Sequence, residues 1–145
     1  MSAGAEDYGW STAESPESCQ YITPEILKFL TYLGARRICD LGSGNGSLVA
    51  ALAARKFYAI GVEYDKAGVA LSKTQYPGIN FYNLGVQDDP STLLNIEGEQ
   101  FDAVVSTEVI EHLYSPHLLP VFARKLLKPG GHLVISALQE LVWVN

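Results

Sequence analysis

The sequence contains only two cysteines, Cys19 and Cys39, among its 145 residues. Two cysteines are too few for a disulfide framework, so a hydrophobic core has to hold the fold together. Cys39 lies within an apolar run and is predicted to be a buried free thiol. The chain also lacks a basic amino-terminal segment followed by an apolar stretch, so we expect no signal peptide.

Long hydrophobic runs and clustered cations are missing as well. No apolar run approaches the roughly 18 residues that a membrane-spanning helix needs, and we therefore expect a cytoplasmic protein with no membrane partner. Ten Lys and Arg stand against sixteen Asp and Glu, which gives a formal net charge of −6. Because phosphate backbones are bound by clustered cations, we expect no nucleic-acid partner.

The remaining composition is that of a folded domain, with 48% hydrophobic and 18% charged residues. A chain of this length suits one domain. Residues 1–22 show no periodicity and are predicted to form a lead-in that could act as a lid. The domain is expected over residues 23–145, and its first helix is predicted to have Thr23 as N-cap, Pro24 at the first helical position and Gly34 at its end.

Short apolar runs and helical segments alternate after this helix. The apolar runs are continuous rather than alternating, which indicates strands buried on both faces and thus a parallel sheet between helices. Right-handed crossovers favour an α/β, doubly wound topology with five strands, of which the fifth is expected to form an edge. The predicted strands are 37–41, 58–63, 79–82, 101–106 and 133–137; the predicted helices are 47–55, 66–75 and 117–127, with one further turn near Leu93-Leu94.

A glycine-rich loop from Asp40 to Gly46 (D-L-G-S-G-N-G) leaves the first predicted strand and opens a helix, as a nucleotide-binding turn does. Its alternating glycines permit a tight turn and a close approach of the backbone to a ligand. Glu63 ends the second strand, where a carboxylate can bind both hydroxyls of a ribose. Ser47 occupies the position where a dinucleotide fingerprint has Gly or Ala, which disfavours a nicotinamide oxidoreductase.

This pattern, D-x-G-x-G-x-G followed about twenty residues later by an acidic strand end, resembles the class I S-adenosylmethionine-dependent methyltransferases. Residues 61–65, 101–105 and 126–131 resemble further family motifs, and residues 106–112 are similar to a stretch of the ubiquinone-biosynthesis-type O-methyltransferases. The resemblance implies a Rossmann-like methyltransferase fold. Because family members continue beyond their fifth strand, it also implies that the C-terminal strands are missing through truncation, or that a partner or second copy covers that edge.

The resemblance implies a set of residues around the methionine part of S-adenosylmethionine. Gly42 and Gly44 would line this part of the cofactor, and Asp40 would lie near its amino group. Thr107, at the end of the fourth strand, would face the same side, and Tyr21 would cover the cofactor. The glycines could equally serve only a tight turn, and Tyr21 could be ordinary packing.

A second set is implied for the nucleoside part. Glu63 would bind the ribose, Tyr64 would pack against the adenine, and Val86, Gln87 and Asp88 would meet the adenine edge. For these residues too the sequence leaves a plainer explanation open. Tyr64 could be ordinary packing, and Asp88 could cap a helix or add solubility to a loop.

Glu108, Glu111 and His112 have the spacing i, i+3, i+4, which predicts a shared helical face. Two carboxylates and an imidazole could bind a divalent cation or serve acid–base chemistry. The alternative is that His112 orients the loop while the glutamates cap or face water, and because the sequence favours it we predict no metal. For an oxygen acceptor, His112 is the candidate catalytic base, since imidazole titrates near neutral pH.

Three functions follow from these residues. The first is methyl transfer from S-adenosylmethionine to a small-molecule acceptor, with oxygen preferred as the atom methylated. The second is a non-catalytic S-adenosylmethionine-binding or scaffold domain, which the early end after strand five favours. The third, a nicotinamide oxidoreductase, is disfavoured by Ser47.

Overall fold

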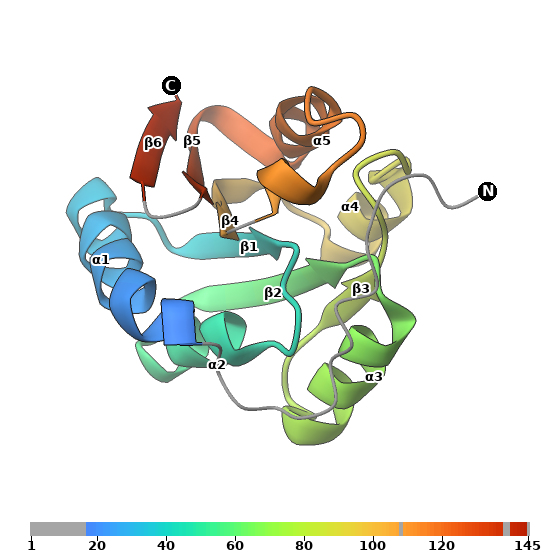
Figure 1. Ribbon diagram of the computed structural model, residues 1–145, viewed down its shortest axis with the longest axis horizontal. Helices are drawn as coiled ribbons and strands as arrows, with labels where there is room; N and C mark the ends of the chain where they lie inside the picture. Colours follow the sequence, from blue (N-terminus) through green and yellow to red (C-terminus); the bar gives the residue numbers. More distant parts are fainter. Residues whose placement is uncertain (1–16, 108, 138–139, 145) are drawn as a thin grey trace.

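The computed structural model describes residues 17–107, 109–137 and 140–144, and within them the side chains of residues 22–107 and 109–136. Its strands are β1 (Arg37–Leu41), β2 (Tyr58–Glu63), β3 (Phe81–Asn83), β4 (Phe101–Thr107), β5 (Leu127–Ala137) and β6 (Glu140–Val144). They form one sheet in the order β3-β2-β1-β4-β5-β6 (Figure 1). The strands β1 to β5 pair in parallel, and β6 runs antiparallel to β5.

Helices cover both faces of this sheet. They are α1 (Glu17–Leu33), α2 (Ser47–Ala54), α3 (Lys66–Gln75), α4 (Ser91–Glu97) and α5 (Leu118–Leu126), with a short 3-10 helix η1 (Ile110–His112). The first three pack on one face, and α4 and α5 pack on the other. This confirms the predicted doubly wound α/β fold. Within the residues that the structure describes, no helix combines the length and the apolar character that crossing a bilayer requires.

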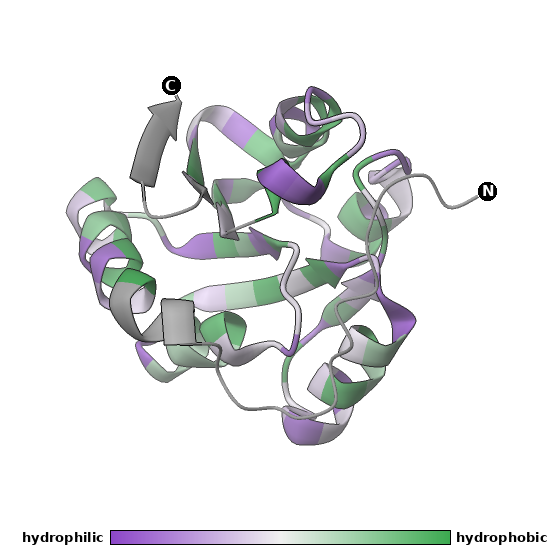
Figure 2. Cartoon of the chain, in the orientation of Figure 1, coloured by the Kyte–Doolittle hydropathy of each residue, from purple (hydrophilic) through white to green (hydrophobic). Residues whose placement is uncertain are grey.

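The core consists of two hydrophobic clusters, one on each side of the sheet. Successive residues of β1 alternate between them: Ile38 faces α1 and α2, whereas Cys39 faces α4 and α5. Cys39 is buried and free, as predicted. Apolar residues occupy most positions of α2, and this helix is accordingly coloured as hydrophobic in Figure 2. Burial of the central strands on both faces explains why their sequences are continuous apolar runs.

The first helix begins earlier than predicted. It starts at Glu17, so Thr23 is not its N-cap and Pro24 lies inside it. The predicted boundary between lead-in and domain, at residues 22 and 23, therefore falls within α1. The reason is that residues 17–22 contain no glycine or proline that would stop a helix, and burial of Ile26 and Leu30 offsets the roughly 3 kcal/mol that an interior proline costs.

The five predicted strands are present as β1 to β5, but the prediction that β5 forms the edge of the sheet is wrong, because β6 covers that edge. Pairs run from Leu133 with Val144 to Ala137 with Glu140. Residues 140–144, E-L-V-W-V, have high strand propensity. The hairpin was missed because the connecting residues 138 and 139, Leu and Gln, carry none of the usual turn signals.

Other boundaries differ by smaller amounts. β5 begins at Leu127 rather than Leu133, because Lys128 to Gly131 bulge from the ladder without ending it: Leu127 pairs with Phe101, and pairing resumes between His132 and Ala103. The helical turn predicted near Leu93 is the seven-residue α4. The ends of β3, β4, α2 and α5 lie within two residues of their predicted positions.

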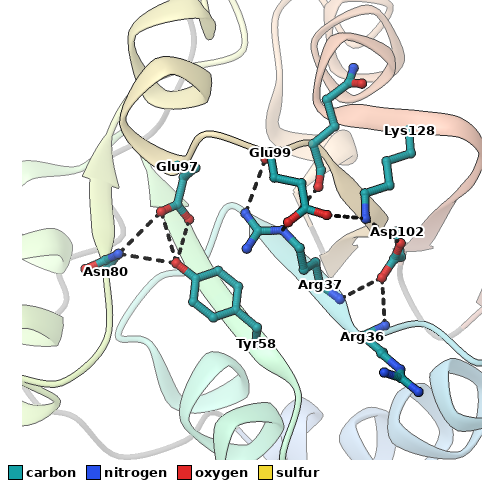
Figure 3. Close-up of polar contacts among 9 residues, drawn as sticks. Arg36, Arg37, Tyr58, Asn80, Glu97, Glu99, Asp102 and Lys128 are labelled. Carbon is teal, nitrogen blue, oxygen red and sulfur yellow. Dashed lines mark hydrogen bonds and ion pairs between the residues drawn. The ribbon is translucent and has the colours of Figure 1, made fainter.

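Polar contacts join the elements at the amino ends of the strands (Figure 3). Asp102 accepts hydrogen bonds from the backbone N–H groups of Arg36 and Arg37, at 2.9 and 2.8 Å. Lys128 Nζ lies 3.2 Å from Asp102 Oδ1 and 2.8 Å from Glu99 Oε1. A second group in the same view joins Glu97 to Tyr58 and Asn80. These polar groups at the amino ends of the strands thus have hydrogen-bond partners, in contrast to several at the carboxyl ends.

Candidate cofactor site

The glycine-rich loop lies across the carboxyl ends of β1 and β2. The N–H groups of Gly42 and Ser43 both donate to the carbonyl of Val62, at 2.7 and 3.0 Å, and this fixes the loop on the end of β2. Gly46 then forms the N-cap of α2. A Cβ at Gly46 would lie 2.8 Å from the Phe81 ring, so the missing side chain lets the loop pack tightly against β3.

Glu63, the last residue of β2, holds the loop from the other side. Its side chain is buried, and it accepts hydrogen bonds from Gly44 N through Oε1 at 2.8 Å and from Asp65 N through Oε2 at 2.7 Å. Burial raises the pKa of Glu63, while the N–H groups of Asp65 and Gly44 oppose that shift. An ionised carboxylate has about four acceptor sites, so Glu63 keeps acceptor capacity for a hydroxyl group of a ligand.

Asp40 lies one position before the end of β1 and is only 1% exposed. Its Oδ1 has no hydrogen-bond partner. Burial, and after it the charge of Glu63, raise the pKa of Asp40 to about 8. A buried carboxyl group with an unsatisfied oxygen is complementary to a cationic group of a ligand.

Unsatisfied oxygens concentrate in this corner of the molecule. Among the described side chains, four buried oxygens have no partner, and three of them lie here: Asp40 Oδ1, Ser43 Oγ and Asp65 Oδ2. The fourth is Ser136 Oγ near the end of β5. Buried groups without partners are rare in folded proteins. Their concentration beside a glycine loop therefore indicates a place where a polar ligand completes the hydrogen bonding. As acceptors, these oxygens fit the ribose hydroxyls and the ammonium group of S-adenosylmethionine, which donate.

The residues predicted for the adenine lie together, although Tyr64 follows β2 and the others lie on the loop after β3. Gly85 N donates to Asp88 Oδ2 at 2.8 Å. A Cβ at Gly85 would come within 2.5 Å of Gln87 Oε1 and 2.7 Å of Tyr64 Cδ2, so both side chains converge on this glycine. Val86 packs against the α4/α5 side of the core. The structure thus brings Tyr64, Gln87 and Asp88 into one group, and their contact with adenine stays a prediction.

The residues predicted for the methionine side are only partly described. Thr107 is the last residue of β4, the strand that pairs with β1. Tyr21 lies in α1, but its side chain falls outside the described part of the chain. The sequence did not indicate Val109, whose side chain occupies the space where a Cβ of Gly42 would lie. No local pattern could have revealed this contact, because it joins two loops that are far apart in the sequence.

The predicted helical face of Glu108, Glu111 and His112 is wrong. The helix at this point is the single 3-10 turn η1, which begins only at Ile110, so no continuous helix carries all three residues. Glu108 lies outside the described residues. His112 Nε2 is 3.8 Å from Glu111 Oε1, and the His112 side chain is 38% exposed. In the described ranges, no three His, Cys, Asp or Glu side chains form a group that could hold a metal ion.

Comparison with known proteins identifies the fold and its family. A family profile described as a methyltransferase domain matches residues 39–135. The ubiquinone biosynthesis O-methyltransferase of Acinetobacter baumannii is 27% identical over 109 residues, which are 74% of this chain and 46% of that protein. A solved amino pentose methyltransferase from Micromonospora echinaspora, with S-adenosylmethionine bound, has a TM-score of 0.69 at 23% identity and covers 81% of this chain and 50% of its own.

A second solved structure, a sugar N-methyltransferase from a Streptoalloteichus species, has a TM-score of 0.68 at 20% identity over 94% of this chain and 59% of its own. At these identities the structural likeness shows the fold alone. The chain spans about half the length of the curated relatives it matches. The family profile covers more than half of the chain and includes the glycine loop and β2 to β4, so the chain belongs to the methyltransferase-domain family.

Proposed function

We propose that this chain binds S-adenosylmethionine at the carboxyl ends of β1 and β2 and takes part in transfer of its methyl group to a small-molecule acceptor. The observation that carries the proposal is the group of three unpartnered, buried oxygens beside the glycine loop. Membership of the methyltransferase-domain family supports the reaction class. Ser47, where a dinucleotide site has Gly or Ala, argues against a nicotinamide cofactor.

The chain's own residues would bind and orient the cofactor, which supplies a methyl group activated on a sulfonium. Glu63 would accept from the ribose hydroxyls while it holds Gly44, and Asp40 would face the ammonium group. Tyr64 and Gln87 would flank the adenine. The remaining task is alignment of the acceptor atom with the methyl group, which is a matter of positioning.

We propose oxygen as the atom methylated, because the curated relatives are named as O-methyltransferases, although one structural neighbour is named as a sugar N-methyltransferase. For a hydroxyl acceptor, His112 would remove the proton as the oxygen forms its bond to the methyl carbon and the carbon–sulfur bond breaks. A cytoplasmic location and the absence of nucleic-acid partners remain predictions from the sequence.

A thermal-shift titration tests the cofactor. We expect S-adenosylmethionine and S-adenosylhomocysteine at about one hundred times their Kd to raise Tm by about 5–10 °C, since binding at that ratio stabilises the folded state by about 2.7 kcal/mol. NAD(H) is expected to cause no shift. Stabilisation by NAD(H) alone would overturn the proposal. Binding of S-adenosylmethionine without S-adenosylhomocysteine formation across an acceptor screen would favour the alternative function, a non-catalytic binding module.

With an acceptor from that screen, we expect His112→Ala to lower kcat by about 10²–10⁴-fold if the imidazole is the general base. The affinity for S-adenosylmethionine should not change, because the substitution removes no group assigned to the cofactor. His117→Ala is the matched control, because His117 lies at the start of α5 and is exposed. Equal losses in the two variants, or a kcat of His112→Ala close to that of wild type, would exclude His112 as the base.

A further inference from the structure

Two buried carboxyl groups lie together at the candidate cofactor site. Asp40 is 1% and Glu63 is 5% exposed, and they sit at the ends of adjacent, directly paired strands. Among the described residues, no Lys, Arg or His forms an ion pair with either of them. Ionising both of two neighbouring buried carboxyl groups costs much free energy, because the charges repel each other and are poorly solvated. Such a pair therefore retains one proton.

The hydrogen bonds favour one of the two groups as the holder of that proton. Both oxygens of Glu63 accept from backbone N–H groups, Gly44 N and Asp65 N, and this is the pattern of an ionised carboxylate. Asp40 differs from Glu63, since its Oδ1 is buried and accepts no hydrogen bond. The same order follows from the pKa of Asp40, which burial and the charge of Glu63 raise to about 8.

Among the side chains that the structure describes, the surroundings of Asp40 supply no other charge that would change this assignment. On its face of the sheet, the neighbouring residue of β4 is Val105, and α2 contains no titratable residue. On α1, the charged residues with described side chains, Glu25 and Lys28, are exposed. Cys39 points to the opposite face, and burial raises the pKa of its thiol well above the usual value, so the thiol stays neutral. Besides Glu63, Asp65 on the β2 side is the remaining carboxylate near the loop.

We propose that Asp40 carries a proton in the free protein and releases it to solvent when the ammonium group of the cofactor binds, so that binding is coupled to the loss of one proton. This inference rests on the proposed function, because it assumes that S-adenosylmethionine is the ligand. A positive charge next to Asp40 stabilises the ionised carboxylate, so the proton is no longer needed to neutralise it. In a site of low dielectric this stabilisation does not require direct contact. The site thereby favours ligands with a cationic group over neutral nucleosides.

Isothermal titration calorimetry measures the coupling directly. S-adenosylmethionine is titrated into the wild-type chain at pH 6.5 in a series of buffers, from phosphate with a small ionisation heat to imidazole with a large one. At this pH the α-amino group of the ligand, which ordinarily titrates near 7.7–8.0, is still charged. The slope of observed enthalpy against buffer ionisation enthalpy is expected to show release of about one proton. The apparent Kd should fall by up to about tenfold per pH unit between pH 5.5 and 7.

Ligand and variant controls sharpen this test. S-adenosylhomocysteine, which keeps the ammonium group but lacks the sulfonium charge, should release the same proton; release with S-adenosylmethionine alone would contradict the assignment to the ammonium group. In Asp40→Asn the release should fall to about zero. Asp89→Asn, a change at an exposed aspartate that caps α4 through Ser91, should leave the release intact.

The outcomes separate this inference from the proposed function. Binding of S-adenosylmethionine to wild type without proton release would overturn only the inference, and the wild-type slope decides this even if Asp40→Asn fails to fold. Release that persists in a folded Asp40→Asn variant would also overturn it, because the proton would then come from another group. No binding to wild type in any buffer would overturn both the inference and the proposed function.

Discussion

Glu63→Gln is expected to weaken binding of S-adenosylmethionine by about 10–100-fold. In wild type both oxygens of this buried side chain accept from backbone N–H groups, at 2.8 Å from Gly44 and 2.7 Å from Asp65. An amide has only one oxygen, so its NH₂ group would face one of these donors and leave it unsatisfied. A buried donor without a partner costs about 1–3 kcal/mol, but that cost falls on the free and the bound protein alike, so it lowers stability. The affinity falls because the ribose hydroxyls lose a charged acceptor, and a hydrogen bond to a charged group contributes about 1.5–3 kcal/mol, or roughly 10–100-fold. Calorimetric titration with S-adenosylmethionine measures the effect.

Glu97→Gln is the matched control for this substitution. Glu97 also accepts hydrogen bonds at the edge of the sheet, from Tyr58 Oη at 3.0 Å and Tyr82 Oη at 3.2 Å, but it lies at the amino ends of the strands (Figure 3). Its loss should lower Tm and leave the affinity for S-adenosylmethionine unchanged. If Glu63→Gln binds as tightly as wild type, Glu63 neither holds the loop in a binding conformation nor meets the ribose.

The position of this carboxylate could be predicted from the sequence because its determinants are local. An apolar run marks β2, the last residue of that run is Glu63, and the carboxyl ends of parallel strands meet at one edge of a sheet. The glycine loop after β1 follows from the same reasoning. What the sequence did not show is that Glu63 is already bonded to this loop through Gly44, since that bond depends on how the loop folds back over β2.

The predictions that were wrong concern features that tertiary contacts decide. Pro24 and Thr23 look like a helix start, yet α1 continues to Glu17. The spacing of Glu111 and His112 suits an α-helix, but the chain makes only a 3-10 turn before α5 begins at Leu118. β6 pairs with β5 without a recognisable turn sequence. In each case the local sequence pattern predicts the structure that it usually forms, whereas packing or strand pairing with distant residues produces a different one.

Gly42→Ala is expected to destabilise the chain by about 2–5 kcal/mol and to abolish measurable cofactor binding. Gly42 has φ +87°, a conformation that costs another residue about 1–2 kcal/mol. A Cβ at this position would also collide with Val109, and overpacking of this kind costs about 1–3 kcal/mol more. Denaturant unfolding measures the stability, and calorimetric titration with S-adenosylmethionine measures the binding.

Two further variants separate the cost of the positive φ at Gly42 from the cost of the collision with Val109. Gly98→Ala is the matched control, because Gly98 has φ +74° with no atom within 4 Å of an added Cβ and lies at the end of α4. It should lose only about 1–2 kcal/mol and keep its affinity for the cofactor. In Gly42→Ala/Val109→Ala the collision is removed while the backbone strain remains, so the double variant should be more stable than the sum of the two single changes predicts. Strict additivity would mean that the Val109 side chain does not hold the loop after β4 against the glycine loop.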